Sequence, residues 1–180
     1  MKEKFDLILE KDEEILNIYT PVKKKVYFLN VTMTTLLCLF VCGLTALALF
    51  VPEEGYEPAK PIMAIIPVGL FILGELLSLF LVSRWLKNTV YAITNNRILI
   101  RTGIIGVDFK SLDLSSIGAT NVLVGFIDKI LGGKTGTIKF GNMSSPINGA
   151  NGSNFTFSNI SAPYETYKHI KELIGQAKNK

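Results

Sequence analysis

Few residues of this 180-residue chain have a type and spacing that could support catalysis. Its one histidine, His169, lies in a lysine-rich segment without an evident orienting acid, so a Ser–His–Asp arrangement is not indicated. Cys38 and Cys42 lie in an apolar run that lacks the further ligands a metal site needs. The segment Gly132–Thr135 ends like a phosphate-binding P-loop, but Asp128 takes the place of its first glycine. We therefore expect no enzyme, no cofactor and no metal site.

One ionisable residue stands out by its position. Glu75 lies near the middle of an apolar run, where a charged carboxylate is costly. Two roles remain open for it. It is either a neutral acid hydrogen-bonded to Ser78, Thr35 or a partner helix, or a proton or ion site in an oligomeric channel or transporter. A proton relay needs more than one group, and Glu75 is the only acidic or basic residue within residues 28–51 and 62–83.

Glu75 belongs to the second of two long apolar runs, which cover residues 28–51 and 62–86. Each run exceeds the ~20 residues that a helix needs to cross ~30 Å of hydrocarbon. We expect a transmembrane helical hairpin over residues 28–87, with a short polar loop at 52–61.

Charged residues around the runs predict how the hairpin is oriented. Lysines at 23–25 precede the first run, and Arg84 and Lys87 close the second, whereas residues 52–61 carry three glutamates and one lysine. Basic residues favour the cytoplasmic side of a membrane. The sequence thus predicts a multi-pass protein of the cell membrane with both termini in the cytoplasm and the loop outside.

Small side chains recur at helical spacing within both runs. They let membrane helices approach closely, so we expect these faces to pack within the hairpin or in a homo-oligomer. The residues are Thr34, Cys38, Cys42 and Ala46 in the first run and Gly74 and Ser78 in the second.

The polar remainder reads as one small domain. Residues 88–180 alternate short β-prone runs with turns, and the last segment, Pro163–Lys178, has the apolar spacing of an amphipathic helix. Residues 1–27 form a cytoplasmic segment in which Glu14–Tyr19 suits a strand of the same domain. The expected fold class is α+β, with about seven antiparallel strands in one strongly bent sheet closed by the C-terminal helix.

Three local features are also expected within this domain. Asn95 and Asn96 suit a tight hairpin turn with positive φ. A strand is expected at Ile104–Lys110, and a short helical turn at Gly125–Leu131. The Asn-, Gly- and Ser-rich stretch Asn142–Ser153 reads as a loop of undetermined role.

The chain carries short motifs at Glu13–Leu16, Tyr91–Gly103, Leu112–Ile117, Phe126–Leu131, Gly136–Ile138 and in the helix after Pro163. Together, these motifs resemble the bacterial membrane-flanked PH-like domains over nearly the whole chain. The resemblance implies a PH-like fold, a bent seven-stranded sheet with a C-terminal helix, fused to a transmembrane hairpin. PH-like folds bind lipid headgroups, peptides or proteins, so any function carried over is an analogy.

The expected function is a binding or scaffolding module at the cytoplasmic face, with membrane lipids, a protein partner or a second copy as ligand. The net charge of +4 is mild, and because part of the basic excess flanks the hairpin, anionic lipid explains it better than nucleic acid does. Scattered basic residues and two apolar ones are the candidate contacts: Arg97, Arg101, Lys110, Phe126, Ile127 and Lys129.

Overall fold

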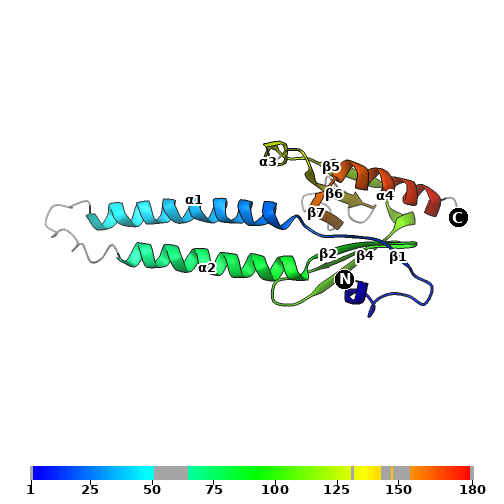
Figure 1. Cartoon of the computed structure of the whole chain (residues 1–180), viewed down its shortest axis with the longest axis horizontal. Helices are drawn as coiled ribbons and strands as arrows, with labels where there is room; N and C mark the ends of the chain where they lie inside the picture. The colour runs from blue at the N-terminus through cyan, green and yellow to red at the C-terminus, as the bar shows by residue number, and fades with distance from the viewer. Residues whose placement is uncertain (1, 51–64, 131, 143–146, 148–154, 179–180) are drawn as a thin grey trace. The chain divides into compact units, whose positions relative to one another are not determined.

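The computed structural model describes residues 2–50, 65–130, 132–142, 147 and 155–178 (Figure 1). The expected loop at 52–61 and most of Asn142–Ser153 lie outside the described residues. The chain divides into two units: the hairpin unit, Lys24–Arg84, and the PH-like unit, which combines Met1–Lys23 with Trp85–Lys180.

The hairpin unit is built from two long helices, α1 (Lys23–Phe50) and α2 (Ile65–Asn88). Pro67 lies in the first turn of α2, where its missing N–H removes no intrahelical hydrogen bond. Both helices are long and apolar enough to cross a membrane, by length and composition. α1 begins before the apolar run does, because the three lysines at positions 23–25 form its first turn.

The PH-like unit begins with a four-stranded antiparallel sheet, sheet A, in the order β1-β2-β3-β4. β1 precedes the helices, whereas β2 follows them; they are neighbours, with Tyr19 opposite Tyr91. The chain therefore leaves sheet A for the helices and returns to the adjacent position. The strands are β1 (Ile15–Tyr19), β2 (Val90–Thr94), β3 (Arg97–Thr102) and β4 (Asp108–Asp113).

A second antiparallel sheet, sheet B, has the order β5-β6-β7 and is followed by the C-terminal helix α4 (Pro163–Lys178). The short helix α3 (Phe126–Ile130) lies between its first two strands, and Gly132 and Gly133, which both have positive φ, follow in the connection to the next strand. The strands are β5 (Ala119–Leu123), β6 (Thr135–Gly141) and β7 (Phe155–Ser161).

Two expectations about the strands were wrong in detail. The described strands form two sheets rather than one bent sheet, because the 3-10 helix at Leu114–Ser116 separates β4 from β5 and these strands do not pair. The strand expected at Ile104–Lys110 begins only at Asp108. Gly103 and Gly106 turn the chain between these points, so that Ile104 and Ile105 lie in the β3–β4 turn.

The main core of the PH-like unit lies between the sheets and under α4. Ile138, Phe140 and Phe157 from sheet B and Ile170 from α4 are fully buried there with residues of sheet A. Tyr91 of β2 stacks on Phe157, with 4.8 Å between ring centroids.

The Tyr91 hydroxyl also ties the two sheets together. It accepts a hydrogen bond from the Ser158 amide at 3.1 Å and donates to the Ser158 carbonyl at 3.4 Å. Burial raises the pKa of Tyr91 despite these bonds, so the hydroxyl remains a neutral donor throughout the physiological range. The bond meets β7 where its register with β6 is irregular and Asn159 has a positive φ of 55°.

A second, smaller core covers the opposite face of sheet A. Phe5, from the segment before β1, is fully buried against Val90, Ala92 and Leu99. The first residues of the chain are therefore part of the PH-like unit and shield a face of its sheet that would otherwise be apolar and exposed.

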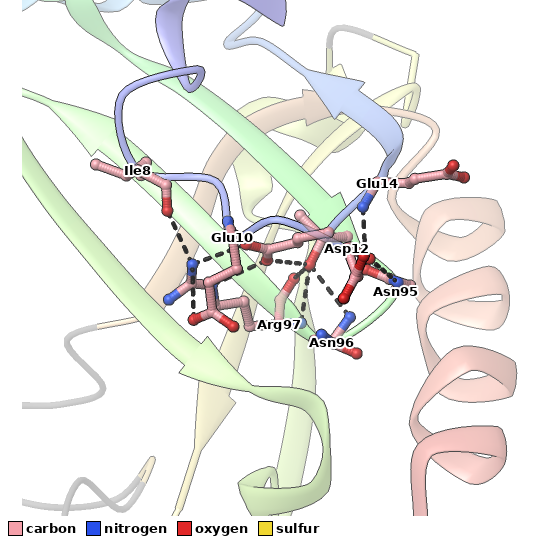
Figure 2. Close-up of polar contacts among 9 residues, drawn as sticks. Ile8, Glu10, Asp12, Glu14, Asn95, Asn96 and Arg97 are labelled. Atoms are coloured by element: carbon pink, nitrogen blue, oxygen red, sulfur yellow. Dashed lines mark hydrogen bonds and ion pairs between the residues drawn. The ribbon is translucent and has the colours of Figure 1, made fainter.

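The turn between β2 and β3 forms without the positive φ expected for Asn95 and Asn96. The Thr94 hydroxyl closes it instead, accepting from the Arg97 amide at 3.0 Å and the Asn96 amide at 3.2 Å. Asn95 faces the N-terminal segment, and its side chain accepts from the Glu14 amide at 3.2 Å, as Figure 2 shows.

Candidate functional site

Polar side chains of the hairpin unit pair across the two helices. The Asn30 amide donates to the Ser78 hydroxyl at 2.5 Å, and the Tyr27 and Ser83 hydroxyls are 2.9 Å apart. Hydrocarbon offers polar groups no partner. Pairing across the helices supplies these side chains with the partners that such a solvent would lack.

Glu75 is held by the same facing surfaces. The Thr35 hydroxyl donates to Glu75 Oε1 at 2.8 Å, and the Thr34 hydroxyl lies 3.0 Å from Oε2. Both carboxyl oxygens therefore have a partner on α1, whereas Ser78, the other expected partner, is bonded to Asn30. This geometry favours a packing role for Glu75; the channel or transporter role stays a prediction.

The small residues expected to pack lie on these inner faces. A Cβ atom added at Gly74 would lie 3.3 Å from Cys38 Sγ, tighter than ordinary van der Waals contact. The Cys42 thiol donates to the Pro67 carbonyl at 3.2 Å. Thr34 packs beside Glu75, and Ala46 is half-buried. By contrast, Gly43 and Gly69 face open space.

The outer faces of both helices are apolar and exposed. Large side chains such as Leu37, Phe40, Leu73 and Phe80 are each more than half exposed. A water-soluble pair of helices buries its apolar stripe and exposes its polar one. The hairpin unit does the reverse, which is the polarity required of helices whose solvent is lipid.

Basic groups of the PH-like unit gather where the chain leaves α2. Lys4 Nζ donates to the Lys87 carbonyl at 2.6 Å, and an Arg101 Nη1–H donates to the Asn88 carbonyl at 3.0 Å. Cations are favoured at these unsatisfied carbonyls at the end of a helix. Burial, followed by repulsion from Arg101, lowers the pKa of Lys4.

The remaining candidate contacts do not form one patch with Arg101. Lys110 is exposed on the edge strand β4. Lys129, Phe126 and Ile127 lie on α3, where the Phe126 side chain is 78% exposed. These residues therefore lie at separate exposed positions, and the surroundings of each do little to restrict which ligand it could bind.

Arg97, the last candidate contact, is engaged inside the PH-like unit (Figure 2). Its guanidinium donates to Glu13 Oε1 at 2.9 Å, to Glu13 Oε2 at 2.7 Å and to the Ile8 carbonyl at 2.9 Å. The Thr94 hydroxyl donates to the same Glu13 carboxylate at 2.6 Å. The Glu13 side chain is 0% exposed and that of Arg97 is 17% exposed.

Burial and hydrogen bonding shift the pKa values of both Glu13 and Arg97. Burial alone would raise the pKa of Glu13, but hydrogen bonds from Arg97, Thr94 and the Glu10 amide outweigh it and hold the pKa below its usual value. The hydrogen bond with Glu13 raises the pKa of Arg97 in turn. Both groups stay charged at neutral pH and stabilise each other, so we read the pair as a clamp that holds the N-terminal segment on sheet A.

Within the described residues, no group of three or more His, Cys, Asp or Glu side chains could hold a metal ion. His169 lies beside Glu165 and Tyr19 at an open hollow of about 360 Å³. Asp128 accepts a hydrogen bond from the Thr135 hydroxyl and another, at 3.0 Å, from the Gly125 amide, so it closes the α3 loop.

Residues 29–174 match the family model described as "Bacterial PH domain". The chain belongs to the bacterial PH domain family. The match includes most of α1 and all of α2, so in this bacterial PH domain the family resemblance extends through both helices. The curated proteins and the solved structures gave no significant match.

Neither the Glu13–Arg97 clamp nor the burial of Phe5 against sheet A is predicted by the sequence. From the sequence, Glu13 stands out only as part of a family motif, and Arg97 only as a candidate lipid or partner contact. A signal was present, because the motifs containing Glu13 and Arg97 both carry a charge next to β-prone residues. Pairing them requires knowing that β1 and β2 are neighbours, which their 70-residue separation in sequence hides.

The hairpin contacts predict a measurable coupling between Glu75 and Thr35. A double-mutant cycle with Glu75→Leu and Thr35→Val should give a coupling of about 0.6–1.7 kcal/mol, as for other hydrogen bonds between membrane helices. The free energy of hairpin unfolding would be measured in detergent–SDS mixed micelles, from energy transfer between dyes on the two helices. Thr32 is exposed on α1, so Thr32→Val should show no coupling. Equal coupling of Thr32 and Thr35 would contradict the packing role.

The clamp predicts a specific acid sensitivity. Glu13→Gln should lower the free energy of unfolding at pH 7 by about 3 kcal/mol, the lower end of the range for a broken buried pair. Because the folded pKa of Glu13 is depressed, this advantage is complete above the unfolded value of about 4.3 and disappears as the pH falls through the folded value. Urea unfolding of the full chain in micelles would be followed by the fluorescence of Trp85, its single tryptophan.

The neighbouring Glu10 provides the control for this experiment. It lies 3.4 Å from Arg97, and its side chain is 69% exposed, so Glu10→Gln should cost less than about 1 kcal/mol. A difference between wild type and Glu13→Gln that is the same at pH 3 and pH 7 would show that the Glu13 charge is not what stabilises the clamp.

Proposed function

We propose that this bacterial PH domain is a membrane-anchored binding or scaffolding module. Its hairpin spans the cell membrane, and its PH-like unit binds lipid headgroups or a protein partner at the cytoplasmic face without catalysing a reaction. The observation that carries the proposal is the polarity of the hairpin unit, in which hydrogen bonds such as Thr35–Glu75 face inward and side chains such as Phe40 face outward.

The cytoplasmic orientation is supported by charge. Lys23, Lys24 and Lys25 begin α1, and Lys87 lies in the last turn of α2. The sequence between the helices contains three glutamates at 53, 54 and 57. Under the positive-inside rule, this distribution leaves both termini in the cytoplasm.

Binding rather than catalysis is supported by the surface of the PH-like unit. Exposed basic residues, Lys110 and Lys129, and the exposed Phe126 suit attraction to an anionic surface combined with apolar contact. We omit Arg97 from the proposed contacts, because Glu13 and Ile8 already occupy its guanidinium.

Cysteine labelling tests the anchoring and its direction. In a Cys38→Ala/Cys42→Ala background, Ala59→Cys should react with a membrane-impermeant maleimide in intact bacterial cells, because residue 59 belongs to the segment expected outside. Gln176→Cys, at an exposed position on α4, should react only after lysis. Labelling of Gln176→Cys in intact cells would show the orientation to be wrong, and release of the chain by carbonate washing would rule out a membrane span.

Extraction in polymer nanodiscs tests the binding. Each lysine near the surface adds about 1 kcal/mol of attraction to anionic lipid, so Lys110→Gln/Lys129→Gln should lower the enrichment of anionic lipid around the full chain roughly twofold or more. Lys168→Gln/Lys171→Gln, a matched change on α4, should leave it unchanged. A co-purified protein lost only from the first variant would support the partner form of the proposal. The absence of both effects would refute the binding role at these positions.

A further inference from the structure

We propose that the PH-like unit rests on the bilayer through two apolar tips that insert among the lipid headgroups. One tip is the β3–β4 turn at Ile104–Ile105, and the other is α3 at Phe126 and Ile130. This inference rests on the membrane anchoring proposed above and adds the surface that faces the lipid.

The first observation is exposure at the β3–β4 turn. The Ile105 side chain is 92% exposed and that of Ile104 is 41% exposed. Turns are normally built from Gly, Pro, Asn, Asp or Ser, so two adjacent β-branched apolar residues at such an exposed tip are unusual. Val107, at the end of the turn, and Phe109, on β4, are also apolar and more than a third exposed.

The shape of this turn is fixed rather than loose. Gly103 has a positive φ of 148°, and a Cβ atom at this position would lie only 2.1 Å from the Gly106 carbonyl oxygen. Only glycine allows this approach. The backbone therefore holds Ile104 and Ile105 outward in one defined arrangement, which lowers the entropic cost of insertion.

The turn is also bonded to the residues that end α2. Trp85–Asn88 belong to the PH-like unit, and the Asn88 side-chain amide donates to the Gly103 carbonyl at 3.1 Å. The Arg101 guanidinium, on the strand entering the turn, donates back to the Asn88 carbonyl at 3.0 Å. Ile104 follows Gly103 directly, so the tip lies beside the point where the chain emerges from an apolar helix.

The second tip lies at the same end of the unit. The Val22 amide, just before α1, donates to the Asn159 carbonyl of β7 at 2.7 Å. The Ala162 amide, just after β7, donates to the Lys134 carbonyl in the α3–β6 connection at 2.9 Å. Figure 1 shows α3 and the β3–β4 turn toward the same end of the PH-like unit.

The exposure of α3 matches that of the first tip. The Phe126 side chain is 78% exposed and the Ile130 side chain is 67% exposed. Its connections to β7 and to the entry into α1 therefore put a second apolar surface on the side of the unit where the chain enters and leaves the helices.

Charge identifies lipid as the occupant. Lys4 and Arg101 lie near the first tip, because they donate to the carbonyls of the adjacent residues Lys87 and Asn88, and Lys129 lies on the second tip. Cations around apolar side chains are the pattern of segments that lie in the interface of an anionic bilayer. Asp108, which pairs with Thr102 at the base of the turn, is the acidic residue nearest the first tip in sequence.

Spin-label accessibility tests the inference on the full chain. The protein, in a Cys38→Ala/Cys42→Ala background, would be reconstituted into vesicles of phosphatidylcholine and phosphatidylglycerol, with a nitroxide at Ile105→Cys or Phe126→Cys. Leu73→Cys, exposed on α2, reports the bilayer, and Leu16→Cys, exposed on β1 next to the residue that pairs with Thr94, reports the opposite end of sheet A. The measurement compares collisions with oxygen, which concentrates in lipid, against collisions with a water-soluble nickel chelate.

The expected result is an oxygen-to-nickel ratio at residues 105 and 126 several-fold above that at residue 16 and approaching that at residue 73. A ratio at both tips equal to that at residue 16 would overturn the inference while leaving the anchoring intact. An aqueous ratio at residue 73 would overturn the anchoring itself. Shielding of residue 105 from both reagents, with spin–spin coupling between copies, would identify a protein interface in place of lipid and so refute the proposal.

Discussion

The buried ion pair between Glu13 and Arg97 joins two stretches of chain that the helical hairpin separates. The two side chains lie 2.7 Å apart, with that of Glu13 fully buried and that of Arg97 mostly buried, and losing one partner of a buried pair costs far more than losing one at a surface. Around it, β1 pairs with β2 and Phe5 fills the outer face of sheet A. The PH-like unit is therefore complete only when residues from before α1 fold onto residues from after α2.

The hairpin unit distributes its polar and apolar side chains in the opposite way to the PH-like unit. In the PH-like unit, apolar side chains such as Ile138 and Phe157 are buried, whereas in the hairpin unit the polar side chains of Thr34, Glu75 and Asn30 face inward. One chain thus contains two units with opposite distributions of polar and apolar side chains. The hydrogen bonds within the hairpin are the physical reason why a carboxyl group is tolerated in the middle of an apolar helix.

Much of this could be predicted from local pattern. The apolar runs, the helix at Pro163–Lys178 and the strands flanking Asn95 follow from periodicity and composition, which are properties of neighbouring residues. The two sheets, the position of β4 and the closure of the β2–β3 turn by Thr94 do not. They depend on where Gly103 turns the chain and on which strands meet.

The partners of the candidate site were harder still, because each joins residues distant in sequence. Arg97 looks like a free surface cation from its neighbours alone, and only the β1–β2 register brings Glu13 to it. Of the partners expected for Glu75, the facing of the two helices selected Thr35, and it added Thr34, which was expected only as a packing residue. The family match begins at residue 29 and so leaves out β1, Phe5 and Glu13. A domain cut at that boundary, or begun at residue 88, would expose the apolar face of Val90, Ala92 and Leu99 and leave Arg97 without its carboxylate, so the module has to be understood as a domain interrupted by its own hairpin.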